Sequence, residues 1–168
     1  IAFYRMLISS VILTPVLLYK YKKELKHFLD YRMAAVGFFL AVHFYFWISA
    51  FNYTSVANAV IFIALQPLFT YLLEYLFARE DLREGIIKGV FLALIGSIII
   101  GIGDIGIIFD KLWGDLLALV ATFFAAVYLF TGRSLRNRME YLPYIYILYT
   151  YAGLFLGLFA LINGDSFT

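Results

Sequence analysis

The sequence is poor in charged residues, and this scarcity excludes a water-soluble domain. Of its 168 residues only 14% are charged, whereas 64% are hydrophobic, and the mean hydropathy is +0.91. Soluble domains carry about 25% charged residues, because their surface must face water. A chain with so few charges cannot cover itself with a polar surface. Its outer surface must therefore face lipid.

The chain also lacks the residues that several chemistries need. It has no cysteine, which excludes disulfides and thiolate metal sites. Its two histidines, His27 and His43, stand apart and form no His-x-x-x-His pair, so we expect no metal site. The Gly-x-Ser-x-Gly elbow and the Walker phosphate loop are absent from the sequence as well. The net charge of +2 is too small to suggest a nucleic acid partner. Because the motifs above are missing, we also expect no cofactor and no enzymatic activity.

Long apolar runs dominate the sequence instead. A membrane-spanning helix needs about 20 mainly apolar residues, because the hydrocarbon core is about 30 Å thick and each residue rises about 1.5 Å. Six runs qualify, at residues 1–19, 32–51, 55–77, 86–103, 112–131 and 142–162. The first run is not a signal peptide, because five equally apolar runs follow it and no small-residue cleavage site does. We predict an all-α integral membrane protein, and we expect the chain to be a fragment, because it begins inside an apolar run without methionine.

Basic residues are concentrated in alternate loops, and this asymmetry predicts the orientation. Eleven of the thirteen lysines and arginines surround the loops at 20–32, 79–88 and 133–138. The positive-inside rule places these loops in the cytoplasm of a multi-pass protein in the cell membrane. The loop KYKKELKHFLDYR at 20–32 also spaces Leu25, Phe28 and Leu29 as one helical face. We expect this loop to lie along the anionic inner leaflet of the lipid bilayer.

Small residues recur at every fourth position in three of the runs. Lipid supplies no hydrophobic drive between helices, so close backbone approach at small residues must hold the bundle together. We therefore expect packing faces in the runs 86–103, 112–131 and 142–162. The residues expected there are Gly85, Gly89, Ala93, Ser97 and Gly101, then Gly114, Ala118, Thr122 and Ala126, then Gly153 and Gly157.

The run 55–77 carries polar residues that hydrocarbon disfavours. Asn58, Gln66, Thr70 and Glu74 fall on steps of four residues and so form one slowly winding stripe. Such groups face the interior of a bundle or water, because exposing them to lipid is costly. Pro67 is expected to break the helix and to free a backbone carbonyl. We interpret the stripe as the lining of a substrate cavity; the alternative is that these groups bond neighbouring helices and the proline only bends the span.

Three further side chains are candidates for a substrate pathway. His43, one turn before Trp47, is either a proton or substrate site or a neutral histidine bonded to a neighbouring helix. Arg5 either snorkels to the outer surface or lines the outer mouth of the pathway. Ser9, Ser10 and Thr14 are expected to hydrogen-bond within their own helix around Pro15.

The order of features supports a family resemblance. AFNYTSVANA at 50–59 leads into a span with Pro67 inside it, ARED follows at 78–81, and a glycine-rich run comes next. This order resembles the first half of the EamA-type permeases of the drug/metabolite transporter superfamily. GDLLALVATFFAAVYLFTGRSLR at 114–136 is similar to the opening helix of that family's second repeat, and Arg5 fits an arginine often seen early in its second helix. The resemblance extends over essentially the whole chain.

The resemblance implies an architecture and a function. It implies a six-helix fragment of a ten-helix bundle built from two repeats of inverted topology. Residues 1–111 would be the remainder of the first EamA-type repeat, and residues 112–168 the start of the second. It further implies a permease that moves small metabolites or amino-acid-like solutes by alternating access through a central cavity. Its partners would then be a small-molecule substrate and the remaining helices of the full-length protein. The alternative is a multi-spanning membrane enzyme or a flippase-type, lipid-handling protein on the same bundle.

Overall fold

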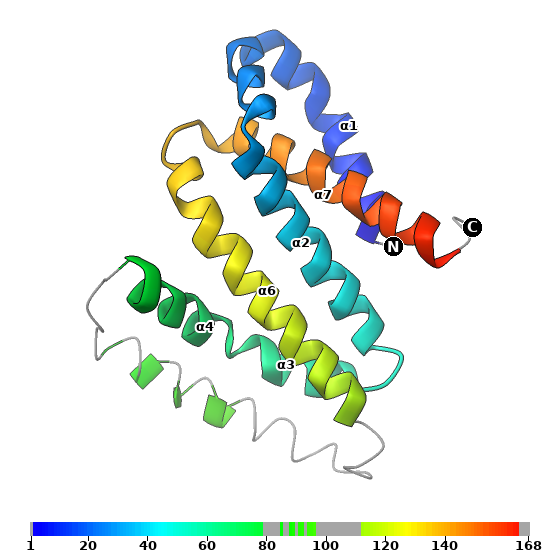
Figure 1. Cartoon of the computed structure of the whole chain (residues 1–168), viewed down its shortest axis with the longest axis vertical. Helices are drawn as coiled ribbons and strands as arrows, with labels where there is room; N and C mark the ends of the chain where they lie inside the picture. The colour runs from blue at the N-terminus through cyan, green and yellow to red at the C-terminus, as the bar shows by residue number, and fades with distance from the viewer. Residues whose placement is uncertain are drawn as a thin grey trace. The chain divides into compact units, whose positions relative to one another are not determined.

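The computed structural model describes residues 2–78, 85, 88–89, 91–92, 94–96 and 112–164, and no strand occurs among them (Figure 1). In chain order the elements are α1 Ala2–Lys20, the 3₁₀ helix η1 Lys22–Leu29, α2 Tyr31–Ala50, α3 Val56–Ile63, α4 Gln66–Leu73, the π-helical turn η2 Glu74–Ala78, α6 Leu112–Arg136 and α7 Tyr141–Asn163. The prediction of an all-α protein is confirmed.

Within this described part, five segments are long and apolar enough to cross a membrane: α1, α2, the stretch from α3 to η2, α6 and α7. Their bounds agree with the predicted runs to one residue, except that α6 continues to Arg136 instead of ending at residue 131. The extra turn carries arginines, which are favourable at a helix C-terminus and whose long side chains can reach water. Most of the predicted run 86–103 lies outside the described residues. The protein is an all-α, multi-pass membrane protein.

The distribution of side chains is that of a bundle surrounded by lipid. Large apolar side chains point outward; Val11, Ile12 and Leu154 are 63%, 65% and 64% exposed. Most buried positions of α6 are instead occupied by small residues such as Ala118 and Ala121. Small residues let backbones approach closely, which is how helices associate where solvent supplies no hydrophobic drive.

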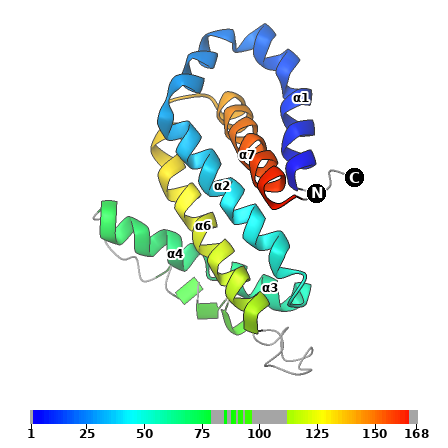
Figure 2. The ribbon, with the colours of Figure 1, turned by 45° about the vertical axis from the view of Figure 1, so that its right-hand side comes forward.

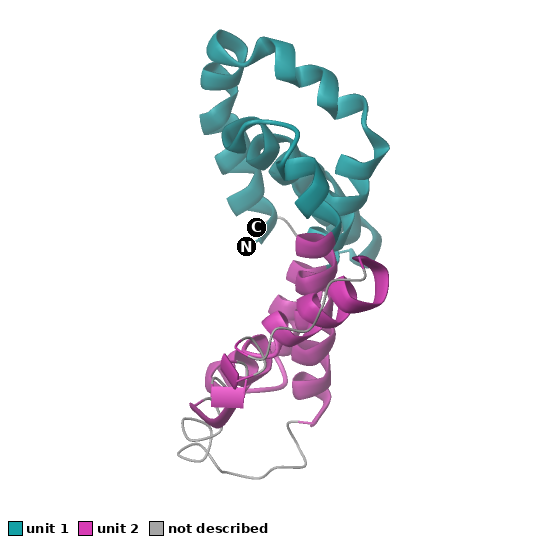
Figure 3. Cartoon of the chain, turned by 90° about the vertical axis from the view of Figure 1, so that its left-hand side faces the viewer, with its two compact units in different colours: residues 1–42, 131–168 teal, residues 43–130 magenta. Residues whose placement is uncertain are grey.

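The chain forms two compact units, one of residues 1–42 with 131–168 and one of residues 43–130 (Figure 3). In the first unit, α1 and α7 lie side by side and run in opposite directions (Figure 2). Glycines on α7 meet side chains of α1: a Cβ on Gly153 would lie 3.4 Å from Met6 Cβ, and one on Gly157 would lie 3.0 Å from the Phe3 ring. Both glycines therefore lie on a packing face, as predicted.

Another close approach in the first unit joins α2 to α7. A Cβ on Gly37 would collide with the Tyr151 Cβ and lie 3.2 Å from the Ala152 backbone nitrogen. Backbone atoms cannot rotate away, so only glycine fits at this crossing. The largest fully buried side chains of this unit are Leu17, Met33, Val36, Leu135, Pro143 and Ile147.

The second unit packs α6 against α3 and the end of α2. Its buried cluster consists of Ala50, Ala59, Leu117 and Ala118, with Phe46, Trp47 and Phe62 packed against it.

The predicted small-residue face of α6 is confirmed within this unit. Ala118, Thr122 and Ala126 have no exposed surface. A Cβ on Gly114 would lie 2.6 Å from the Thr54 backbone nitrogen.

The packing face predicted on the run 86–103 stays a prediction. Ala93, Ser97 and Gly101 lie outside the described residues. At Gly85 and Gly89, which are described, an added Cβ would meet no described atom within 4 Å.

Candidate functional site

The membrane span from 56 to 78 is interrupted one turn before Pro67. α3 ends at Ile63 and α4 begins at Gln66, with Ala64 and Leu65 between them. These two residues have φ/ψ of −64°/−17° and −78°/−12°, close to the 3₁₀ conformation. Pro67 has no N–H to donate to the carbonyl four residues earlier, which accounts for the lost α-helical register. The helix is tightened at this point and not unwound.

The four polar residues of the stripe are all half-buried: Asn58, Gln66, Thr70 and Glu74. The Thr70 hydroxyl donates to the Gln66 carbonyl at 3.0 Å, so it is satisfied within its own helix. The Asn58 backbone N–H donates to the Ser55 hydroxyl at 3.2 Å, which makes Ser55 the N-cap of α3. The side-chain amides of Asn58 and Gln66 form no hydrogen bond with another described side chain. In the stripe, these two amides are the groups with hydrogen-bonding capacity left for a further partner.

Glu74 marks a second irregularity of the same span. Its backbone N–H bonds to the carbonyls of both Thr70 and Tyr71, and the π-helical turn η2 begins at this residue. Single π-helical turns inside α-helices are rare and often occur at functional sites. No residue type announces such a turn, so the sequence did not predict it.

His43 is bonded to α6. Its Nδ1 lies 2.8 Å from the carbonyl oxygen of Ala121, and the ring is buried. A carbonyl oxygen only accepts, so Nδ1 carries a proton and donates it. This bond is the one expected if His43 joins two helices. Nε2, the ring nitrogen that the bond does not use, is the atom left for a proton or a substrate.

Aromatic rings surround His43. Its ring stacks on Trp47, with centroids 6.1 Å apart and an angle of 24° between planes, and the Tyr128 centroid lies 6.4 Å away. Trp47 in turn meets Phe51 edge-on at 5.2 Å. His43 and Trp47 therefore belong to one aromatic cluster of the second unit, the unit that also contains the polar stripe. Arg5, by contrast, belongs to the first unit, where it is exposed in the first turn of α1.

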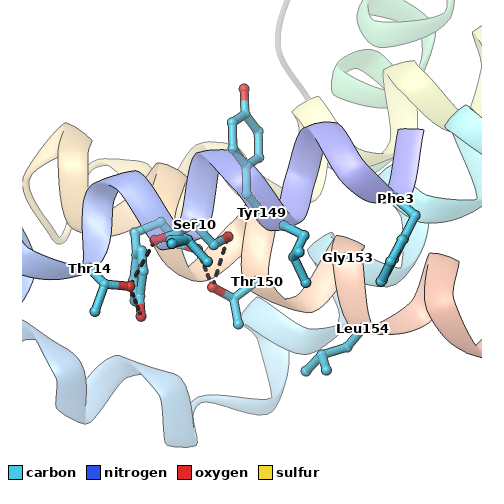
Figure 4. A pocket seen from close by; sticks show the side chains of 10 residues that line it. Phe3, Ser10, Thr14, Tyr149, Thr150, Gly153 and Leu154 are labelled. Atoms are coloured by element: carbon cyan, nitrogen blue, oxygen red, sulfur yellow. Dashed lines mark hydrogen bonds between the residues drawn. The ribbon is translucent and has the colours of Figure 1, made fainter. Parts of the chain in front are cut away.

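The first unit contains a cavity of about 240 Å³ between α1 and α7 (Figure 4). Its walls are mostly apolar, but a row of hydroxyl groups lines one side. Ser10 and Thr14 come from α1, and Tyr146 and Thr150 from α7. The Thr14 Oγ1 lies 3.3 Å from the Tyr146 hydroxyl, and the Thr150 Oγ1 lies 3.3 Å from the Ser10 Oγ.

Counting protons shows what these hydroxyls do. Thr14 donates its only hydroxyl proton to the Ser10 carbonyl at 2.8 Å, so Tyr146 must be the donor in its contact with Thr14. Thr150 likewise donates to the Tyr146 carbonyl at 2.8 Å, so Ser10 must be the donor to Thr150. All four protons are used, and two of the bonds join α1 to α7. The hydroxyl row is therefore an interhelical bond network.

This network corrects the expectation that Ser10 and Thr14 bond only within their own helix. Thr14 does bond the carbonyl four residues before it, but both residues also bridge to α7. Their partners are 132 and 140 residues away in the chain, so no local pattern could reveal the pairing. The signal that was available is the same four-residue spacing of hydroxyls in both runs, Ser10 with Thr14 and Tyr146 with Thr150.

The part of the chain that the structure describes contains no group of three or more His, Asp or Glu side chains able to hold a metal ion.

These features define a multi-pass, all-α membrane protein in which one interrupted span carries a stripe of polar side chains. A model of the EamA-like transporter family matches residues 1–102, more than half of the chain, and the protein therefore belongs to that family. The resemblance noted from the sequence is confirmed, and the protein is a membrane transporter of the drug/metabolite type. No curated protein and no solved structure matched the chain.

Proposed function

We propose that this protein is a secondary transporter that moves small metabolites or amino-acid-like solutes across the cell membrane by alternating access through a central cavity. The observation that carries the proposal is the pair of half-buried amides, Asn58 and Gln66, on an interrupted span of a transporter-family chain. An unsatisfied polar group in hydrocarbon costs several kcal/mol. Such amides persist beside water, a substrate or a partner helix. In transporters, interrupted spans line the cavity that holds water and substrate.

Each residue of the proposed pathway has a role that follows from its chemistry. The amides of Asn58 and Gln66 can both donate and accept, so they suit a solute that carries an amino and a carboxyl group. Thr70 and Glu74 continue the stripe, and the Glu74 carboxylate would favour a cationic group. Trp47 offers an apolar wall. His43 Nε2 and Arg5 complete the proposed set; Arg5 would lie at the outer mouth.

The orientation is part of the proposal. The basic loops at 20–32, 79–88 and 133–138 would face the cytoplasm of a plasma-membrane protein built from ten helices in two inverted repeats, divided here at residue 111. Residues 1–168 contain no cysteine, so single cysteines introduced here report cleanly once any cysteine elsewhere in the full-length protein is replaced. An impermeant thiol reagent on intact cells should label Asn52→Cys and spare Lys23→Cys, since both native side chains are exposed. Labelling of position 23 alone would reverse the orientation.

The proposed pathway is tested by transport in proteoliposomes with the full-length protein and a panel of radiolabelled amino acids. If the Gln66 amide meets the substrate, Gln66→Leu should raise KM by about two- to twelvefold and leave the thermal stability unchanged, since one hydrogen bond contributes about 0.5–1.5 kcal/mol. Uptake no higher than in empty vesicles for every compound would refute the substrate class.

The chain offers a matched pair of controls. Thr70 and Thr122 both bond the carbonyl four residues earlier, at 3.0 and 2.8 Å, but only Thr70 lies on the stripe, and Thr122 is fully buried. Thr70→Val should alter KM, whereas Thr122→Val should change stability alone. Reduced stability with an unchanged KM in Gln66→Leu would mean that the amide bonds another helix, and the cavity assignment would be wrong.

A further inference from the structure

The basic segment between α1 and α2, residues 19–31, is folded against the bundle. The Phe28 ring meets Tyr146 edge-on, with centroids 5.7 Å apart, and lies 5.9 Å from the Tyr151 ring. The Tyr151 hydroxyl also donates to the Phe28 carbonyl oxygen. At the start of the segment Tyr21 is buried, and its N–H continues the α1 bonding to Leu17 at 2.9 Å. The segment is thus held on α7 at one position and on α1 at another.

These contacts set the depth of the segment along the bundle. Tyr146 and Tyr151 follow the first residue of α7, Tyr141, by five and ten positions. At a rise of about 1.5 Å per residue they lie roughly 7 and 15 Å along the helix from its end. Both tyrosines lie within the first three turns of α7, the end at which the chain enters this helix from the basic loop at 133–138. Phe28 therefore holds the segment against this end of α7.

The net charge on this segment is positive, because its four lysines outnumber Glu24 and Asp30. Glu24 lies 3.3 Å from His27, and Asp30 lies 2.7 Å from Arg32. Lys20 is attracted to Glu140. No carboxylate among the described residues forms a salt bridge with the lysines of the segment. These lysines are all exposed: Lys20, Lys22, Lys23 and Lys26.

Exposed rings and an aliphatic side chain flank the lysines. Tyr19, Leu29 and Tyr31 are 95%, 91% and 80% exposed, which is unusual for apolar side chains unless lipid covers them. Tyrosine prefers the membrane–water interface, because its ring is apolar and its hydroxyl is polar. The segment thus combines interfacial side chains with a row of exposed cations.

We propose that residues 19–31 form a binding site for anionic phospholipid headgroups, with the phosphodiester bound by Lys22, Lys23 and Lys26. The partner is a lipid because the lysines lie beside exposed apolar side chains, which a soluble anion would leave uncovered. An anionic headgroup matches the net positive charge of the segment, whereas a zwitterionic headgroup carries no net charge. This inference does not depend on which solute the protein transports.

The test uses the full-length protein in nanodiscs with equal amounts of phosphatidylglycerol and phosphatidylcholine. The lipids that stay bound after mild delipidation are counted by native mass spectrometry. A lysine near an anionic surface contributes about 1 kcal/mol, about fivefold in affinity. The variant Lys22→Gln/Lys23→Gln/Lys26→Gln should therefore lower the preference for phosphatidylglycerol by at least about fivefold. The matched control, Arg133→Gln/Arg136→Gln/Arg138→Gln, removes three charges from another basic loop and should lower it by less than about twofold.

Two further measurements keep the result interpretable. The charge-retaining variant Lys22→Arg/Lys23→Arg/Lys26→Arg should keep the preference, which separates loss of charge from loss of folding. An environment-sensitive fluorophore on Leu29→Cys should respond to phosphatidylglycerol and not to phosphatidylcholine alone. An equal loss of preference in the lysine and arginine variants, or an unchanged preference in the lysine variant, would overturn the proposal. So would a loss of preference in the charge-retaining variant.

Discussion

Replacing Gly114 by alanine tests the packing of α6 most directly. Gly114 is the third residue of α6, and a Cβ there would lie 2.6 Å from both the Thr54 nitrogen and the Tyr53 carbonyl carbon. Both are backbone atoms, so the clash can be relieved only by moving the loop or the helix. Next to it, the Thr54 hydroxyl donates to the Asp115 carboxylate at 2.6 Å, a bond that the same movement would stretch.

The magnitude follows from two opposing effects. Overpacking a well-packed site costs about 1–3 kcal/mol. In the interior of a helix, alanine stabilises the folded state by up to about 1 kcal/mol relative to glycine. The gain is smaller here, because position 114 lies in the first turn, where the backbone makes fewer helical bonds. We therefore expect Gly114→Ala to lower the free energy of unfolding by about 1–2 kcal/mol.

The control is Gly153→Ala, the same substitution in the middle of α7. There a Cβ would lie 3.4 Å from Met6 Cβ, which is ordinary contact, so alanine should leave stability unchanged or raise it by up to about 1 kcal/mol. The free energy of unfolding of the full-length protein is measured by titration with dodecyl sulfate in mixed micelles. A Gly114→Ala variant as stable as the wild type would show that the loop and α6 do not approach as described, and would refute the reasoning.

Three further predictions concern other contacts. In a double-mutant cycle, Ser10→Ala and Thr150→Val should show a coupling of about 0.6 kcal/mol in unfolding titrations, typical of hydrogen bonds between membrane helices, and zero coupling would contradict the α1–α7 network. Arg32 holds the pKa of Asp30 below its usual value of 3.8, so this pair stabilises the fold above that pH, and the contribution disappears as the pH falls through the lowered pKa. Asp30→Asn, which can still cap α2, should show a flatter dependence of unfolding on pH below about 4, and an identical profile would argue against the pair. Gly37→Val should abolish the folded state seen by size-exclusion chromatography, since its Cβ meets the Tyr151 backbone and side chain.

The sequence predicted the spans well because the bilayer dictates their length. The thickness of hydrocarbon sets how many apolar residues a helix needs, so the ends of α1, α2 and α7 could be read to one residue. The small-residue faces of α6 and α7 were also readable, because packing in lipid depends on close backbone approach at regular spacing. The interruption near Pro67 follows from the missing N–H of proline, a purely local cause.

Only part of the candidate site could be predicted from the sequence. The stripe of Asn58, Gln66 and Thr70 follows from helical periodicity, but periodicity says nothing about what lies opposite. That His43 would bond the Ala121 carbonyl, and that the π-helical turn would begin at Glu74, depends on the neighbouring helix and on the packing around each backbone. Whether Asn58 and Gln66 line a transport pathway stays a prediction.

The sequence by itself thus determined three features: the apolar segments, the helix faces that carry small residues, and the polar residues that share a stripe. Each of these features depends on residues within a few turns of one another. Only the tertiary structure decided the partners: Thr150 for Ser10, Tyr146 for Thr14, and the Phe28 carbonyl for Tyr151. These pairs lie more than one hundred residues apart in the chain. A hydroxyl in a membrane must find some partner, but which one it finds is set by the register at which two helices pack.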